Sequence, residues 1–155
     1  MSEMFDLQAA IKEAIQTEKD AMDFYTLGAQ QLHDDKAREV FELLAREERQ
    51  HAFSFFSIYR GSEVPAFEAF IDGPPNTESP WFHSLQQMTL FDFDERKALE
   101  LALEQEEALE QTLRTMAAKI DDPRVAAIYL ANATSTHNHT ELIEEQYRGM
   151  FGMGG

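Results

Sequence analysis

The chain has 155 residues, a length typical of one domain. Its 29 acidic and 13 basic residues give a formal charge of −16, which repels the phosphates of nucleic acids and anionic lipids, so we expect neither nucleic-acid nor membrane partners. It contains no cysteine, which excludes disulfides, thiolate metal sites and thiol nucleophiles. No apolar run is long enough to cross a bilayer, and the N-terminal stretch is acidic where a signal peptide would be basic, so we expect a cytoplasmic protein.

An internal repeat organises the chain. Residues 6–61 align with residues 94–149 without a gap when the sequence is shifted by 88 positions, and 11 of the 56 aligned positions are identical. Identities on this scale indicate a duplicated unit. The sequence therefore predicts two copies of one supersecondary motif, separated by residues 62–93.

Each repeat unit is predicted to be a helical hairpin. Apolar residues recur at spacings of three and four, which is typical of one buried helix face. In residues 6–61 we expect a helix capped by Asp6, a turn at 33–35 and a second helix that stops at Gly61. In residues 94–149 we expect a turn at 121–122, Pro123 in the first turn of the last helix and an end at Gly149, followed by a flexible tail over 150–155.

The connecting stretch 62–93 is unlike the repeats, because it holds four of the five prolines. If the second and third helices run parallel, this loop must travel the full length of the bundle. Its aromatic residues would then pack along the outside: Phe67, Phe70, Trp81 and Phe82. A flexible linker between two separate hairpins is the alternative, but it would leave much of each apolar face in water. We therefore expect one all-α domain over 1–150, a four-helix bundle of two antiparallel hairpins with a long crossover.

Charged residues interrupt the apolar faces at one level. Glu18 lies between Ala14 and Ala21 on the first helix, where a carboxylate is costly without a partner. Glu48 and His51 lie on the apolar face of the second helix, at the i, i+3 spacing that places both side chains on one side. Because these residues are similar distances from the hairpin turn, they should meet near the middle of the bundle.

The repeat places Glu106 and His139 at the same level of the second hairpin, with Thr136 at the position that matches Glu48. One or two divalent cations would supply positive charge to the carboxylates and accept the lone pairs of the neutral imidazoles. Three alternatives stay open. Glu106 could lie on a solvated face, Glu48 and His51 could be a hydrogen-bonded pair without metal, and His137 could replace His139. Glu47 is expected to point to solvent.

This pattern resembles the ferritin-like, rubrerythrin-type di-iron carboxylate proteins, which carry Glu on the first and third helices and Glu-x-x-His on the second and fourth. The resemblance implies two iron ions, with one ion as the alternative and zinc as a substitute. Glu48 would bridge the ions, Glu18 and His51 would complete one of them, and Glu106 and His139 the other. The resemblance also implies Fe(II) oxidation or peroxide reduction in iron handling or oxidative stress, with no catalytic residue apart from the ligands, and a homodimer or larger homo-oligomer.

The chain departs from that family in two respects. Thr136 stands where the fourth-helix Glu is expected, so three carboxylates would face two ferrous ions, and we expect a weaker ion near His139 or a single-metal site. Without cysteine the chain holds no rubredoxin-type iron, so any electron donor is external. Tyr25, Thr136 and Tyr129 are candidates for orienting the metal ligands, with plain core packing as the alternative for the tyrosines. A metal site without catalysis and a metal-free interaction module are the competing functions.

Overall fold

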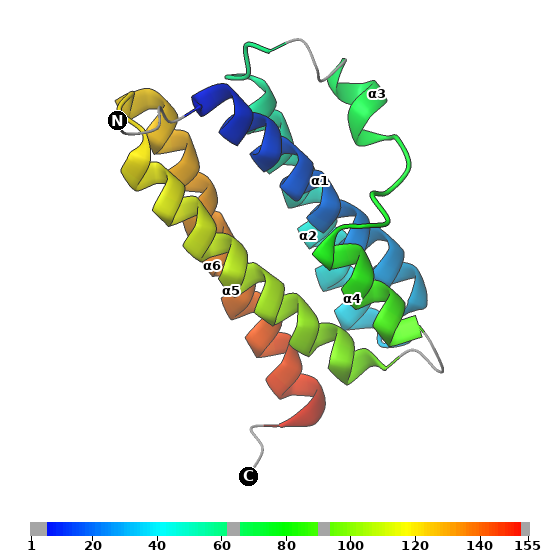
Figure 1. The fold of residues 1–155 in the computed structure, drawn as a ribbon. Helices are drawn as coiled ribbons and strands as arrows, with labels where there is room; N and C mark the ends of the chain where they lie inside the picture. Colours follow the sequence, from blue (N-terminus) through cyan, green and yellow to red (C-terminus); the bar gives the residue numbers. More distant parts are fainter. Residues whose placement is uncertain (1–5, 62–65, 90–93, 153–155) are drawn as a thin grey trace.

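The computed structural model of the chain describes residues 6–61, 66–89 and 94–152. Its elements are four long helices and two short ones: α1 (Leu7–Gln31), α2 (Asp35–Phe56), α3 (Phe67–Ile71), α4 (Pro80–Thr89), α5 (Glu95–Lys119) and α6 (Pro123–Phe151). α1 and α2 form one antiparallel hairpin, and α5 and α6 form a second beside it (Figure 1). The predicted all-α, ferritin-like arrangement of four long helices in two hairpins is confirmed.

An aspartate directly before each long helix caps its first turn. The side chains of Asp6, Asp34, Asp94 and Asp122 each accept a hydrogen bond from a backbone N–H in the first turn of the helix that follows. Such caps satisfy backbone donors that have no partner within the helix. These aspartates form two of the identical pairs of the repeat, so the duplication preserves the residues that set where the helices start.

Two helices end at other residues than the sequence suggested. α2 ends at Phe56 rather than Gly61, because the chain tightens there into turns whose hydrogen bonds span three residues, including Tyr59 N–H to the Phe56 carbonyl. α6 continues past Gly149 to Phe151. Gly152, at φ 77°, stops the helix in the left-handed region that glycine adopts without strain. Of the tail predicted over 150–155, residues 150–151 belong to α6, and residues 153–155 lie outside the described part.

The crossover carries helices rather than being a loop throughout. α4 lies against α1 and α5, and α3 lies against α2 (Figure 1). Trp81 of α4 is only 3% exposed, and its ring lies 5.2 Å from that of Phe24 and 5.6 Å from that of Tyr25. Phe67 of α3 packs against Phe53 of α2 with a ring separation of 5.2 Å. The predicted packing of the crossover aromatics along the bundle is confirmed for these elements.

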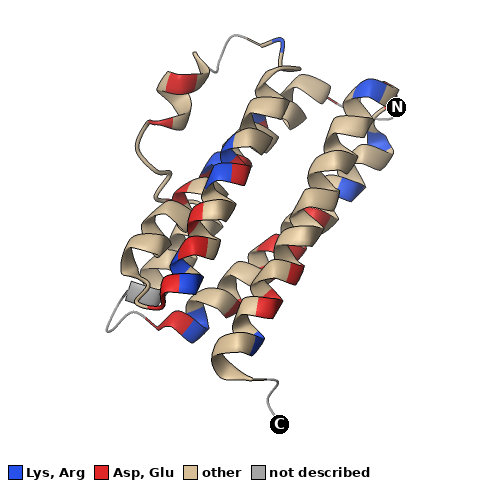
Figure 2. Ribbon diagram, turned by 180° about the vertical axis from the view of Figure 1, so that it is seen from behind, with Lys and Arg blue, Asp and Glu red and all other residues tan. Residues whose placement is uncertain are grey.

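One apolar core runs through both hairpins. Residues of all four long helices and Trp81 belong to it, and its largest fully buried side chains are Phe24, Tyr25, Phe41, Phe55 and Tyr129. Asp and Glu positions are spread along the long helices (Figure 2), but among the described glutamates only Glu18, Glu48 and Glu106 are buried. Among the described residues, no helix is both long and apolar enough to cross a bilayer.

Candidate metal centre

Five ionisable side chains meet in the middle of this core. Glu18 comes from α1, Glu48 and His51 from α2, Glu106 from α5 and His139 from α6, and none is more than 8% exposed. They form two groups, Glu18–Glu48–His51 and Glu48–Glu106–His139, and within each group one ligand atom per residue lies within 4.8 Å of the others. The structure thus brings together all five residues selected from the sequence, and Glu48 belongs to both groups.

Both histidines direct the same ring nitrogen inward. Nδ1 of His51 lies 3.5 Å from Oε2 of Glu18 and 3.5 Å from Oε2 of Glu48. Nδ1 of His139 lies 3.1 Å from Oε1 of Glu48 and 3.5 Å from Oε1 of Glu106. The two rings are parallel to within 6°, with centroids 5.5 Å apart. Glu48 therefore stands between two imidazoles and presents one oxygen to each.

Most inward atoms of this cluster have no hydrogen-bond partner among the residues that the structure describes. They are both carboxylate oxygens of Glu18 and of Glu48, Oε2 of Glu106, and Nδ1 of His51 and of His139. Burying polar atoms without partners costs free energy for each of them. Oxygen and imidazole donors converging on one enclosed point are the ligand set that divalent iron and zinc bind. The residues present fit a metal centre.

The imidazoles hold protons in the absence of metal. Burial alone would lower the pKa of His51, but its contacts with Glu18 and Glu48 outweigh burial and raise that pKa to about 10. Burial likewise opposes protonation of His139, whereas contacts with Glu106 and Glu48 raise its pKa to about 11. At neutral pH both rings are therefore cationic, and they neutralise part of the carboxylate charge in place of metal.

The three carboxylates titrate differently. Burial, followed by the charge of Glu48, raises the pKa of Glu18 well above its ordinary value and that of Glu106 to about 7. Burial also acts to raise the pKa of Glu48, but contacts with Glu18 and the two histidines hold it well below the usual range. Glu48 is thus the anionic centre of the cluster, and a cation entering the site must displace protons from its neighbours.

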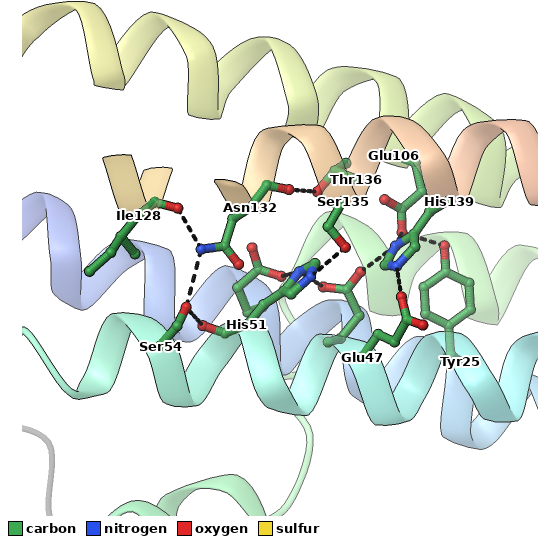
Figure 3. Close-up of polar contacts among 12 residues, drawn as sticks. Tyr25, Glu47, His51, Ser54, Glu106, Ile128, Asn132, Ser135, Thr136 and His139 are labelled. Carbon is green, nitrogen blue, oxygen red and sulfur yellow. Dashed lines mark hydrogen bonds and ion pairs between the residues drawn. The ribbon is translucent and has the colours of Figure 1, made fainter. Parts of the chain in front are cut away.

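The three residues expected to orient the ligands differ in their hydrogen bonds. Tyr25 donates a hydrogen bond of 2.6 Å from its hydroxyl to Oε1 of Glu106. The Thr136 hydroxyl donates to the Asn132 carbonyl on its own helix, at 2.8 Å. Tyr129 packs edge-on against Phe55, and its hydroxyl has no hydrogen-bond partner among the described residues. Of these three residues, Tyr25 is the one that forms a hydrogen bond with a residue of the cluster (Figure 3).

Two residues around the cluster were not foreseen. Glu47 was expected to point to solvent, but its Oε1 lies 2.7 Å from Nε2 of His139, and its side chain is 37% exposed. Ser135 Oγ lies 2.9 Å from Nε2 of His51. The helical period placed Glu47 about 100° away from Glu48, and that rotation turns it toward α6 rather than away from the bundle.

The alternative histidine is not part of the cluster. His137 is about half exposed, and its ring contacts the exposed Glu141 and the partly buried Glu110. Since successive residues on a helix differ by about 100°, only one of His137 and His139 can face inward, and His139 does.

A bundle of antiparallel helical hairpins with two carboxylate–histidine groups in its core defines the class of ferritin-like carboxylate proteins. Within that class, residues 7–66 of the chain match the rubrerythrin family model, a stretch that contains the whole first hairpin with Glu18, Glu48 and His51. The predicted resemblance to rubrerythrin-type proteins is thereby confirmed. Comparisons with curated proteins and with solved structures found no match.

Proposed function

We propose that the protein is a non-haem di-iron protein that oxidises Fe(II) with oxygen or peroxide. The observation that carries the proposal is the set of buried atoms without hydrogen-bond partners, supplied by all four long helices and converging on Glu48. Without metal these atoms lack hydrogen-bond partners, at a cost in folding free energy, whereas a pair of metal ions would give partners to both halves of the cluster. The match to the rubrerythrin family supports iron as the metal.

In this proposal, each of the five buried residues has a role that follows from its position in the cluster. Glu18 and His51 would hold one ion, Glu106 and His139 the other, and Glu48 would be shared between them. The bound metal would supply redox chemistry, and the chain supplies ligand orientation and an enclosed apolar shell. Tyr25 fixes one oxygen of Glu106 and leaves the other free to bind. Since the sequence holds no cysteine, we include an external electron donor in this proposal, and a homodimer as the assembly.

The test is an anaerobic Fe(II) titration of metal-free protein, followed by exposure to oxygen or to peroxide. We expect two ions per chain and a near-ultraviolet absorption band that appears only after the oxidant is added. The Glu48→Ala/His51→Ala variant should lose both. The matched control is His137→Ala/Glu141→Ala, which removes a histidine and a glutamate from the exposed surface of α6 and should behave as the wild type.

A metal site without catalysis is the second candidate, and Thr136 favours it, because its hydroxyl is engaged with its own helix where a fourth carboxylate would complete the ligand set. One redox-inert ion per chain, with no band after oxidant, would support that candidate against ours. If the wild type and the Glu48→Ala/His51→Ala variant both hold no metal and unfold at the same temperature, neither metal function stands.

A further inference from the structure

The two histidines have different partners on the side that faces away from the centre. Nε2 of His139 lies 2.7 Å from a carboxylate oxygen of Glu47, whereas Nε2 of His51 lies 2.9 Å from the hydroxyl oxygen of Ser135 (Figure 3). Glu47 and Ser135 are 88 positions apart, so they occupy the same place in the repeat. Each contacts the histidine of the opposite hairpin, and the two contacts are therefore counterparts that differ in charge.

The inward sides of the two half-sites are closely matched. Each half-site has an imidazole Nδ1, a carboxylate of its own and a share of Glu48. Each is enclosed, since all five ligating side chains are buried. A difference in metal affinity between the halves must then come from the groups that contact the ligands. Tyr25 gives Glu106 a neutral hydrogen bond that Glu18 lacks, and the pair formed by Glu47 and Ser135 is the difference in charge.

A carboxylate behind a metal-binding imidazole strengthens the metal bond. Nδ1 can bind a cation only when the remaining proton is on Nε2, and Glu47 accepts a hydrogen bond from that Nε2–H. The carboxylate fixes the tautomer and the ring orientation, and its charge makes the imidazole a better donor. Ser135 can also accept this hydrogen bond, but it adds no charge. The exposure of Glu47 weakens its effect by solvent screening without abolishing it.

We propose that Glu47 makes the Glu48–Glu106–His139 half the tighter metal site, replacing in part the negative charge that Thr136 does not supply. Glu47 is in this sense a positioning residue, because it acts through His139. The inference rests on the proposed metal function, and it reverses the sequence-based expectation of a weaker ion near His139. Glu18–Glu48–His51 is then the half that fills second and empties first.

Calorimetric titration of the metal-free protein with Co(II) tests this inference one half at a time. Glu18→Gln disables the His51 half, and Glu106→Gln disables the His139 half. We expect the Glu18→Gln protein to bind Co(II) about tenfold more tightly than the Glu106→Gln protein, at the lower end of the 10–100-fold effects of such supporting groups. Adding Glu47→Gln, which keeps a hydrogen-bond acceptor but removes the charge, should weaken Co(II) binding by the Glu18→Gln protein about tenfold and change nothing in the Glu106→Gln protein.

Two further variants complete the design. Glu42→Gln removes an exposed charge from the same helix and should leave both affinities unchanged. Ser135→Glu should raise the affinity of the His51 half. If a single-half variant fails to fold, Glu47→Gln in the otherwise unchanged chain remains informative, because it should weaken only the tighter of two Co(II) binding steps.

Co(II) and Fe(II) binding by the wild type and by Glu47→Gln distinguishes failure of this inference from failure of the proposed metal function. If the wild type binds Co(II) but Glu47→Gln weakens both halves equally, or neither, the inference is wrong and the proposed metal function stands. If the wild type binds neither Co(II) nor Fe(II), the proposed function fails and this inference fails with it.

Discussion

Tyr25 and Glu106 join the two hairpins by a buried hydrogen bond of 2.6 Å, from the phenol on α1 to Oε1 of the carboxylate on α5 (Figure 3). The position equivalent to Tyr25 in the second repeat is Leu113, which cannot donate a hydrogen bond, so Glu18 receives no matching contact. Both oxygens of Glu18 accordingly lack a hydrogen-bond partner among the described residues, whereas Glu106 leaves only Oε2 unsatisfied.

Replacing Tyr25 by Phe should weaken metal binding in a pH-dependent way. The Tyr25 hydrogen bond acts to lower the pKa of Glu106, which burial has raised to about 7, so its loss lets a proton compete more strongly with the metal. A lost hydrogen bond to a charged group corresponds to about 1.5 kcal/mol, or about tenfold in affinity. We expect that loss for Co(II) at pH 7 and a much smaller one at pH 9, by calorimetric titration. An equal loss at both pH values would contradict this account.

The metal-free protein should lose stability as the pH rises from about 6.5 toward 10. The pKa values of His51 and His139 are raised to about 10 and about 11, above the ordinary value of 6.5 that applies in the unfolded chain. Over that window the folded state binds more protons than the unfolded state, so the stabilisation is complete below pH 6.5 and falls as the pH increases. Urea denaturation at pH 6.5, 8 and 9.5 measures this decrease in the free energy of unfolding. The Glu48→Ala/His51→Ala variant should show a flatter profile.

Metal loading should depend on pH in the opposite direction. Both imidazoles are protonated at neutral pH in the absence of metal, so binding a cation to them must release protons, and the apparent affinity should rise with pH. Calorimetry in buffers with different ionisation enthalpies counts the released protons, and we expect at least one for each ion bound. A proton count of zero would mean that the histidines are not ligands.

Thr136→Glu should supply the fourth carboxylate and widen the difference in melting temperature between the metal-free and the metal-loaded protein. Thr136 is fully buried at the repeat position of Glu48, so an added carboxylate there is costly without metal and favourable with it. We expect a lower melting temperature for the metal-free variant, a higher one after Fe(II) or Zn(II) is added, and a higher metal stoichiometry or oxidation rate. If metal does not raise the melting temperature of the variant, the alignment of Thr136 with Glu48 has no functional meaning.

Lys19→Met should loosen the crossover without touching the metal centre. The Lys19 side chain is 4% exposed, and its ammonium contacts Asp23 and donates hydrogen bonds to the carbonyls of Gly73 and Pro74. Methionine retains the apolar stem but leaves these acceptors unpaired, at a cost of about 1–3 kcal/mol. Urea denaturation should show that loss, and hydrogen exchange should increase over residues 66–76. Lys36→Met, at an exposed position of α2, is the matched control and should show neither change.

The helices and the ligands could be predicted because both follow from local spacing. Glu18, Glu48 and His51 stand on the apolar faces of their helices at similar distances from one turn, and the repeat carries the same geometry to Glu106 and His139. The starts of the helices could be predicted for the same reason, since a capping aspartate acts within a single turn. The crossover was harder to predict, because α3 and α4 are short, and their packing against α2, α1 and α5 involves residues distant in sequence.

The sequence by itself determined which side chains face inward and at what height, because the helical period and the antiparallel turn fix both within one hairpin. Only the tertiary structure decided the partners across hairpins: Tyr25 with Glu106, Glu47 with His139 and Ser135 with His51. Those pairs depend on how each hairpin is rotated about its axis against the other. The fit of side chains throughout the shared core sets that rotation, and no local spacing encodes it.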